Sequence, residues 1–149
     1  MKNIFSEEED LNIENFRVRI NGYQFPDSDE YWDANWINVT CVYEGPSSFV
    51  KTEGPLIHLS ELDALLAGLK RLYSRLEGLV EIDFMEPELY MSFDMKKNGE
   101  IDFVLRITPD HHSQKHEYAI AIDQSYLPGV IRQLEKIVSK MYKKDLVRE

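Results

Sequence analysis

The chain has 149 residues, of which 43% are hydrophobic and 30% charged, a composition typical of a single soluble domain that buries its own core. Its net charge of −10 argues against nucleic-acid binding, because phosphate contacts need clustered Lys and Arg. The sequence contains neither a stretch of about 18 apolar residues nor a basic leader before an apolar run, so we expect a cytoplasmic protein with no membrane span.

The acidity is greatest in the first third of the chain, where residues 1–58 hold 11 acids against 4 bases. We expect residues 1–12 to form a flexible acidic segment before the single domain, which spans residues 1–149. The one cysteine, Cys41, excludes an internal disulfide, and its apolar surroundings favour a small core residue over a nucleophile.

Three strands are expected in the first half of the chain. Alternating apolar residues predict half-buried strands at 16–22 and 37–44. A third, more irregular strand is expected at 47–59, because Gly45-Pro46 turns the chain just before it.

An amphipathic helix is expected next. Ser60 is a candidate N-cap, Asp63 completes a capping box, and Gly78 can end the helix. Its apolar stripe has helical spacing and consists of Leu62, Leu65, Leu66, Leu69, Leu72 and Leu76.

The second half contains four further strand signals, at 80–84, 89–96, 101–107 and 116–123. Asn98-Gly99 predicts a tight hairpin, since both residues tolerate positive φ. A second amphipathic helix follows Ser125, with its apolar stripe at Leu127, Val130, Ile131, Leu134, Ile137 and Met141.

The two apolar stripes have the same spacing, shifted by 65 residues, and Ile57 and Ser60 correspond to Ile122 and Ser125. This match favours a duplicated unit of strands followed by a helix, at about 14–77 and 86–142, with a short extra strand between the copies. The alternative is that any two amphipathic helices share a 3.6-residue period. We therefore expect an α+β fold with a mainly antiparallel sheet of about six or seven strands, covered on one face by two amphipathic helices.

The sequence offers little sign of catalysis or cofactor binding. It has no phosphate loop, CxxC pair, HExxH or Gly-x-Ser-x-Gly motif, so we expect neither an enzyme nor a cofactor. His111, His112 and His116 are potential zinc ligands, but their spacing favours a solvated loop. Glu81, Asp83 and Glu86 are interpreted as a solvated strand face with its adjoining turn.

The most unusual stretch is residues 22–39, which combines acids with aromatics. Its order of acids does not match a calcium loop, because Trp32 stands where that loop needs glycine. Aromatic anchors inside a charged rim are more typical of a protein interface. The candidate partner-binding residues are Asp27, Asp29, Glu30, Tyr31, Trp32, Asp33 and Trp36, with Glu81, Asp83 and Glu86 as a secondary surface.

Four stretches together resemble the WapI-type immunity proteins of bacterial polymorphic toxin systems: GYQFPDSDEYWDANWINVTCVYEG, GPLIHLSELDALLAGLKRL, EPELYMSFDMKKNGEIDFVLRI and HEYAIAIDQSYLPGVIRQLEKIV. The most distinctive element is G-Y-x-F-P-D leading into W-D-x-N-W. The resemblance implies a small cytoplasmic protein that binds and blocks a toxin domain, often a nuclease, and it brings no catalytic residues.

An acidic protein of this kind suits a basic toxin, because opposite charge speeds encounter and can fill a basic cleft. The main hypothesis is therefore an immunity protein that neutralises a toxin through the acidic, aromatic stretch. Two alternatives are a carbohydrate or small-ligand module that stacks its ligand on Trp32 and Trp36, and a hydrolase of unknown type.

Overall fold

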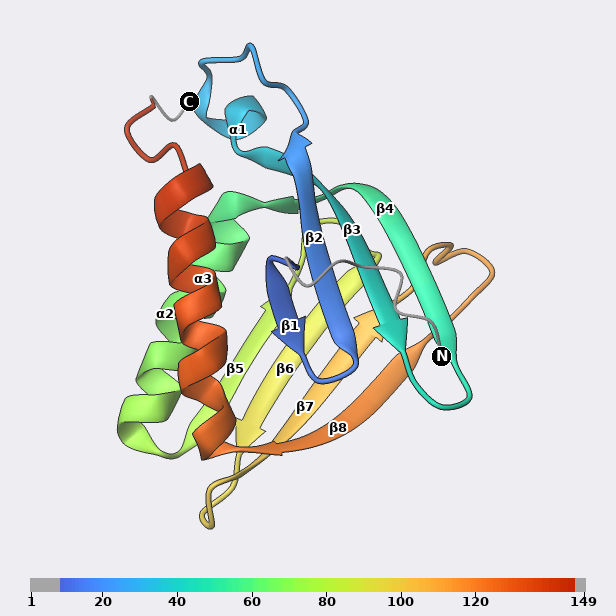
Figure 1. Ribbon diagram of the computed structural model, residues 1–149, viewed down its shortest axis with the longest axis vertical. Helices are drawn as coiled ribbons and strands as arrows, with labels where there is room; N and C mark the ends of the chain where they lie inside the picture. The colour runs from blue at the N-terminus through green and yellow to red at the C-terminus, as the bar shows by residue number, and fades with distance from the viewer. Residues whose placement is uncertain (1–8, 147–149) are drawn as a thin grey trace.

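The computed structural model describes residues 9–146, which form eight strands, two long helices and a short helix (Figure 1). The strands are β1 (Leu11–Ile13), β2 (Phe16–Tyr23), β3 (Trp36–Glu44), β4 (Phe49–His58), β5 (Gly78–Asp83), β6 (Leu89–Met95), β7 (Glu100–Ile107) and β8 (Glu117–Asp123). The helices are α1 (Tyr31–Ala34), α2 (Leu59–Arg75) and α3 (Leu127–Met141), and a 3-10 turn, η1 (Gln124–Tyr126), precedes α3.

The strands form two antiparallel sheets of four, in the orders β1-β2-β3-β4 and β5-β6-β7-β8. The expected α+β class is confirmed, but the single sheet of six or seven strands is replaced by two sheets. The strand expected between the two halves is β5, which pairs with β6 as an edge strand of the second sheet. Each sheet is a meander of sequential strands, so its pairing needs only short connections.

The structure also corrects the expectation for the start of the chain. Residues 1–8 lie outside the described residues, whereas β1 pairs with β2 and places Leu11 opposite Val18. Leu11 and Ile13 are buried, so residues 11–13 belong to the core. A three-residue strand is too short to show a clear alternation, which explains why the sequence pattern does not reveal it.

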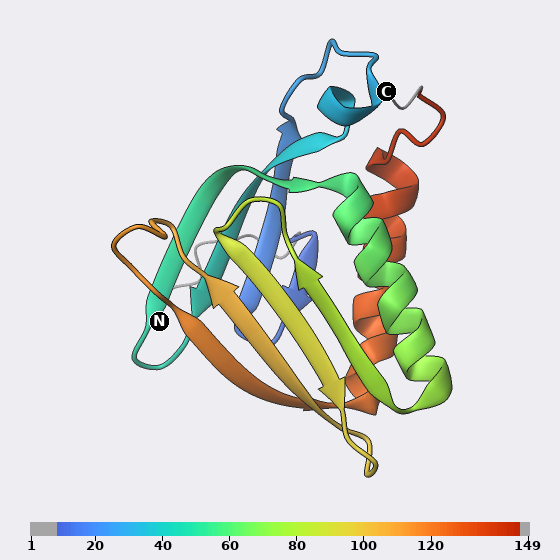
Figure 2. The same cartoon turned by 180° about the vertical axis from the view of Figure 1, so that it is seen from behind.

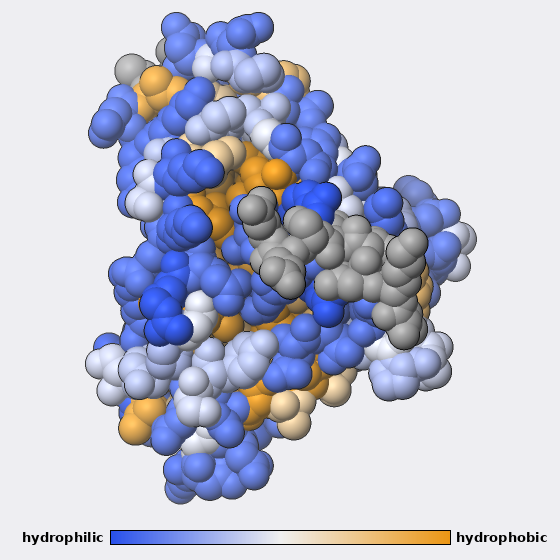
Figure 3. All heavy atoms as spheres, in the orientation of Figure 1, coloured by the Kyte–Doolittle hydropathy of each residue, from blue (hydrophilic) through white to orange (hydrophobic). Residues whose placement is uncertain are grey.

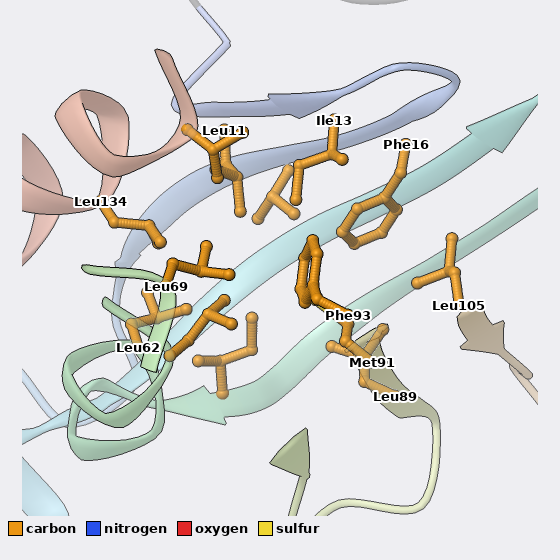
Figure 4. Packing of buried hydrophobic residues seen from close by; sticks show 14 of the residues in the cluster. Leu11, Ile13, Phe16, Leu62, Leu69, Leu89, Met91, Phe93, Leu105 and Leu134 are labelled. Atoms are coloured by element: carbon orange, nitrogen blue, oxygen red, sulfur yellow. The ribbon is translucent and has the colours of Figure 1, made fainter. Parts of the chain in front are cut away.

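The hydrophobic core lies between the two sheets and extends to the helices. The inward residues of β6 and β7 include Phe93 and Phe103, which are fully buried and stack with ring centroids 4.6 Å apart. Figure 4 shows Phe16 from the first sheet close to Phe93 from the second, and Leu134 from α3 beside Leu69 of α2 in the same cluster. The halves therefore share one core.

The N-cap of helix α2 lies two residues before the expected one. His58 is the N-cap and accepts the Ser60 N–H at 3.2 Å, while Glu61 accepts the His58 N–H at 2.8 Å, which completes a capping box. At the other end, Leu76 is the C-cap in the left-handed region with φ 57°, so Leu76 takes the place expected for Gly78.

Helix α3 follows η1, and its expected cap is also displaced. Asp123 caps η1 by accepting the Ser125 N–H at 2.9 Å, and α3 itself begins at Leu127 with Pro128 in its first turn. The two helices pack side by side along one side of the sheets rather than across a sheet face (Figures 1 and 2).

Each half consists of a four-stranded meander followed by a long helix. Helix α2 follows the first sheet but packs against β5 of the second, and α3 follows the second sheet but packs against β1 of the first. The expected units, 14–77 and 86–142, each begin one strand later than the meander that contains them. Duplication of one ancestral unit stays a prediction.

Candidate partner-binding surface

The α1 segment, residues 24–35 between β2 and β3, is folded and closed at its base, where the Gln24 N–H donates to the Trp36 carbonyl at 2.9 Å. Glu30 is the N-cap of α1, and its two carboxylate oxygens accept the N–H groups of Trp32 and Asp33 at 3.0 and 2.9 Å. These two hydrogen bonds lower the pKa of Glu30, because they stabilise the carboxylate form. Glu30 therefore holds the segment in shape.

Tyr31 points into the protein. Its side chain is 1% exposed, and its hydroxyl forms a short hydrogen bond with the hydroxyl of Tyr142, just after α3. The Tyr31 ring also meets the Trp32 ring edge-on, with centroids 5.1 Å apart. This aromatic residue connects the α1 segment to the C-terminal part of the fold.

His58, at the end of β4, is the buried centre of the aromatic group. Its Nδ1 accepts the Ser60 N–H, so the other ring nitrogen, Nε2, carries the proton and donates to the Trp32 carbonyl at 3.1 Å. The rings of Trp32 and Trp36 both lie against His58, with centroids 4.9 and 5.2 Å from it. The two tryptophans thus pack on one imidazole and do not form an open, parallel stacking platform.

Asn35 provides the second connection to the C-terminal part of the chain. Its side chain is fully buried; its Nδ2 donates to the carbonyls of Tyr31 and Lys143, and its Oδ1 accepts the Lys143 N–H at 2.8 Å. The Lys143 ammonium lies over the Tyr23 ring, 4.3 Å from its centroid. Residues 142–143 therefore hold the α1 segment against the domain.

The remaining candidates are solvated. Asp27, Asp29 and Asp33 are exposed, Trp32 is 37% exposed, and Trp36 is half-buried. The seven candidate residues are thus divided: Glu30, Tyr31 and Trp36 have structural roles, while three carboxylates and one indole face the solvent. Solvated carboxylates around an aromatic side chain are suited to contact a basic protein surface.

The secondary candidates lie on β5 and in the turn after it. Glu81 and Asp83 are exposed on the outer side of β5, Glu86 is half-buried in the turn, and the Tyr90 hydroxyl donates to Glu81. The Met85 N–H in the same turn donates to Glu61 at 2.8 Å. Burial raises the pKa of Glu61, against the lowering effect of its two backbone hydrogen bonds.

Neither the histidines nor the cysteine form a reactive site. His111 and His112 lie in the exposed connection between β7 and β8, with ring centroids 4.1 Å apart, and His116 lies at its end. Among residues 9–146, no group of three or more His, Cys, Asp or Glu side chains could hold a metal ion. Cys41 is buried in β3, and burial raises the pKa of its thiol far above the usual range.

Two open depressions lie beside the helices. One, about 700 Å³, lies between α2 and α3 and is bridged by the ion pairs Lys70–Glu135 and Lys144–Asp63, at 3.3 and 3.6 Å. The other, about 670 Å³, lies between α3 and β2, and Figure 3 shows apolar side chains on its floor. Both are broad surface features rather than closed pockets for a small ligand.

Sequence reasoning identifies His58 as a structural residue at a strand end but misses its role as the N-cap of α2, and it does not single out Asn35 or Glu61. The spacing of His58 and Glu61 matches a capping box, but histidine is not among the usual N-cap residues, so Ser60 was the expected cap. Nothing in the local pattern marks Asn35, because its partner Lys143 lies 108 residues away.

The family model described as "Immunity protein WapI-like family" matches residues 6–141 of the chain. The match covers most of the 149 residues, and the chain belongs to this family. No curated protein and no solved structure matches. Among residues 9–146, the helices are all too short or too polar to cross a membrane.

Proposed function

We propose that this WapI-like immunity protein binds a cognate toxin domain and neutralises it by covering the toxin's basic surface. The observation that carries the proposal is the family match over residues 6–141. The net charge of −10 supports a basic partner, and a nuclease toxin suits that charge because nucleases hold a polyanion. Inhibition then requires binding alone, without a catalytic step in the immunity protein.

The α1 segment is the proposed contact, made by Asp27, Asp29, Asp33 and Trp32. Glu30, Tyr31 and Trp36 support it from within: Glu30 caps α1, Tyr31 contacts Tyr142, and Trp36 packs on His58. A surface held at this many points loses little conformational freedom on binding, which favours affinity.

The carboxylates and the indole have different roles in this proposal. Exposed charges at a rim mainly accelerate encounter, and their effect falls with ionic strength, whereas a desolvated aromatic side chain mainly slows dissociation. Among the candidate residues, Trp32 is the aromatic side chain proposed for the second role, because it is exposed whereas Tyr31 is buried against the domain.

The test uses a candidate toxin domain, sought among the genes that neighbour this one in its source genome. Wild-type protein is expected to form a stoichiometric complex and to restore growth of cells that express the toxin. The triple variant D27N/D29N/D33N is expected to associate roughly threefold to tenfold more slowly at low salt with an unchanged melting temperature. The variant W32A is expected to dissociate faster.

A matched control removes three exposed acids elsewhere, in the variant E14Q/E53Q/E135Q, and it is expected to associate at nearly the wild-type rate. If wild-type protein forms no complex and gives no protection, the proposed function is wrong. If the complex forms but the triple variant behaves like its control, the α1 carboxylates are not the contact.

A further inference from the structure

The outer face of the second sheet, which we name the acidic face, consists of the outward residues of β5–β8. The strand register places seven acids and one arginine on this face, which gives it a net charge of −6. The arginine is Arg106, and the acids are Glu81, Asp83, Asp94, Glu100, Asp102, Glu117 and Asp123. Figure 2 shows that no helix or strand of the described chain crosses this face.

The first sheet has no such imbalance. By the same register argument, its outward positions carry Arg17, Arg19 and Lys51 against Glu44 and Glu53, a net charge of +1. With Glu9 included, which lies 3.7 Å from Arg17, the net charge is 0. The two sheets are alike in strand number and order, so the fold itself does not require an acidic outer face.

The acidic face also contains two pairs of like charges directly across neighbouring strands. Asp94 lies opposite Asp102, and Glu100 lies opposite Asp123. Such pairs destabilise a sheet, and a single lysine, Lys96, lies close to both members of the first pair, 2.8 Å from Asp94 and 3.6 Å from Asp102. With Lys96 included, the balance is still −5. Charges that oppose folding are expected where they serve binding.

The middle of the face carries short side chains. A row of short side chains, Ser92, Val104 and Ala119, crosses three strands between the charged rows. At the edge of the face, Leu79 is 59% exposed, an apolar contact point beside the acids. Arg106 is held in place, since it pairs with Glu117 at 2.7 Å and lies 4.2 Å from the Tyr90 ring centroid.

The acidic face is connected to the α1 segment through the turn after β5. Glu61 accepts the N–H of Met85 in that turn with one oxygen and the N–H of His58 with the other. His58 in turn holds Trp32 through its carbonyl. These hydrogen bonds connect Met85 to Trp32, and both of these side chains are partly exposed, at 54% and 37%.

We infer that the acidic face is a docking surface for the basic surface of another protein, and that a toxin bound at the α1 segment extends over it. The identity of the partner rests on the proposed function, whereas the location of the docking surface rests on the charge difference between the sheets. A basic partner neutralises the paired carboxylates, so binding removes the repulsion that the free sheet carries.

The first test removes one acid from each like-charge pair, in the variant E100Q/D102N. Its melting temperature is expected to equal or exceed that of the wild type, because the repulsion is relieved, while association with the same toxin domain slows roughly threefold or more at low salt. The control E14Q/E53Q has the same change in charge and is expected to associate nearly as the wild type does. Equal rates for the two variants would overturn the inference.

The second test places a large side chain in the row of short side chains at the centre of the face. The variant A119R is expected to weaken toxin binding at least tenfold, whereas A67R, the same change at an exposed alanine of α2, leaves binding near the wild-type level. Circular dichroism and melting of both variants verify folding. Unchanged affinity of a folded A119R protein would contradict the inference.

A third test does not depend on the toxin. A decalysine peptide is titrated into isotope-labelled wild-type protein at low salt, and amide shifts are followed by NMR. The largest shifts are expected on β5–β8 and are expected to shrink in E100Q/D102N. Shifts mainly on β1–β4 or on the helices would overturn the docking surface. If decalysine binds to β5–β8 as expected but the toxin domain does not bind the protein, the proposed function is wrong and the docking surface is still supported.

Discussion

The two halves of the molecule, residues 9–77 and 78–146, have the same plan, and two of the differences between them bear on binding. In the first half, β2 and β3 are joined by the 12-residue α1 segment, whereas in the second half β6 and β7 are joined by a tight turn at Asn98-Gly99. The outer faces of their sheets also differ, because the outward strand positions have a net charge of +1 in the first sheet and −6 in the second. What the halves share builds one core, and what differs between them lies on the surface, where recognition takes place.

The first prediction tests whether the halves are one cooperative unit. Phe16 in the first sheet and Phe93 in the second are both fully buried, so F16A and F93A are each expected to cost about 3–5 kcal/mol of unfolding free energy. Urea unfolding followed by circular dichroism is expected to show a single transition for the wild type and both variants. Two transitions in either variant would mean that the halves unfold separately.

The second prediction compares a glycine in each long helix. A Cβ at Gly68 of α2 would lie 2.7 Å from the Val80 Cγ1 of β5, whereas a Cβ at Gly129 of α3 would meet only the end of Arg132, at 3.9 Å. G68A is therefore expected to destabilise by about 1–3 kcal/mol, and G129A to stabilise by up to about 1 kcal/mol. Thermal melting measures both changes, and a shift of the same sign would contradict the close approach of α2 to β5.

The third prediction concerns the connection that only the first half has. N35D keeps the acceptor for the Lys143 N–H but loses both donated hydrogen bonds, to Tyr31 and to Lys143, so we expect a loss of about 1–3 kcal/mol. Hydrogen exchange is expected to accelerate in residues 24–35 and around residue 142, and to stay unchanged in β6 and β7. Uniform acceleration would show that Asn35 supports the whole fold.

The smallest expected effect is in the pH dependence of stability. The pKa values of the two capping glutamates are expected to shift in opposite directions from the ordinary glutamate value of 4.5. Glu30 has a lowered pKa, because it accepts two N–H bonds; its stabilising effect is present above the unfolded pKa and is lost as pH falls through the folded pKa. Glu61 has a raised pKa, because it is partly buried; its contribution is present at low pH and is lost as pH rises through the folded pKa.

NMR titration of the two carboxyl groups measures both directions. The variants E30Q and E61Q assign the two signals. A lower apparent pKa for Glu61 than for Glu30 would contradict the burial of Glu61.

The sequence by itself determined the local elements of this protein. Alternation predicted the strands β2, β3 and β6–β8, and the Asn98-Gly99 pair predicted a turn between β6 and β7. In that turn Gly99 has the expected positive φ, 87°, whereas Asn98 does not have a positive φ, so the two-residue form expected from the sequence is not the one observed. The leucine stripes predicted both long helices. These signals succeed because strand and helix periods arise from neighbouring residues, which the sequence displays directly.

Only the tertiary structure decided how these elements combine. It divided the strands into two sheets, packed each long helix against the edge strand of the other half, and buried Tyr31 while leaving Trp32 in solvent. It also selected His58 as a cap, because its ring can hold the Trp32 carbonyl as well as the start of α2. These choices depend on residues far apart in the chain, and a local period carries no information about which distant surfaces meet.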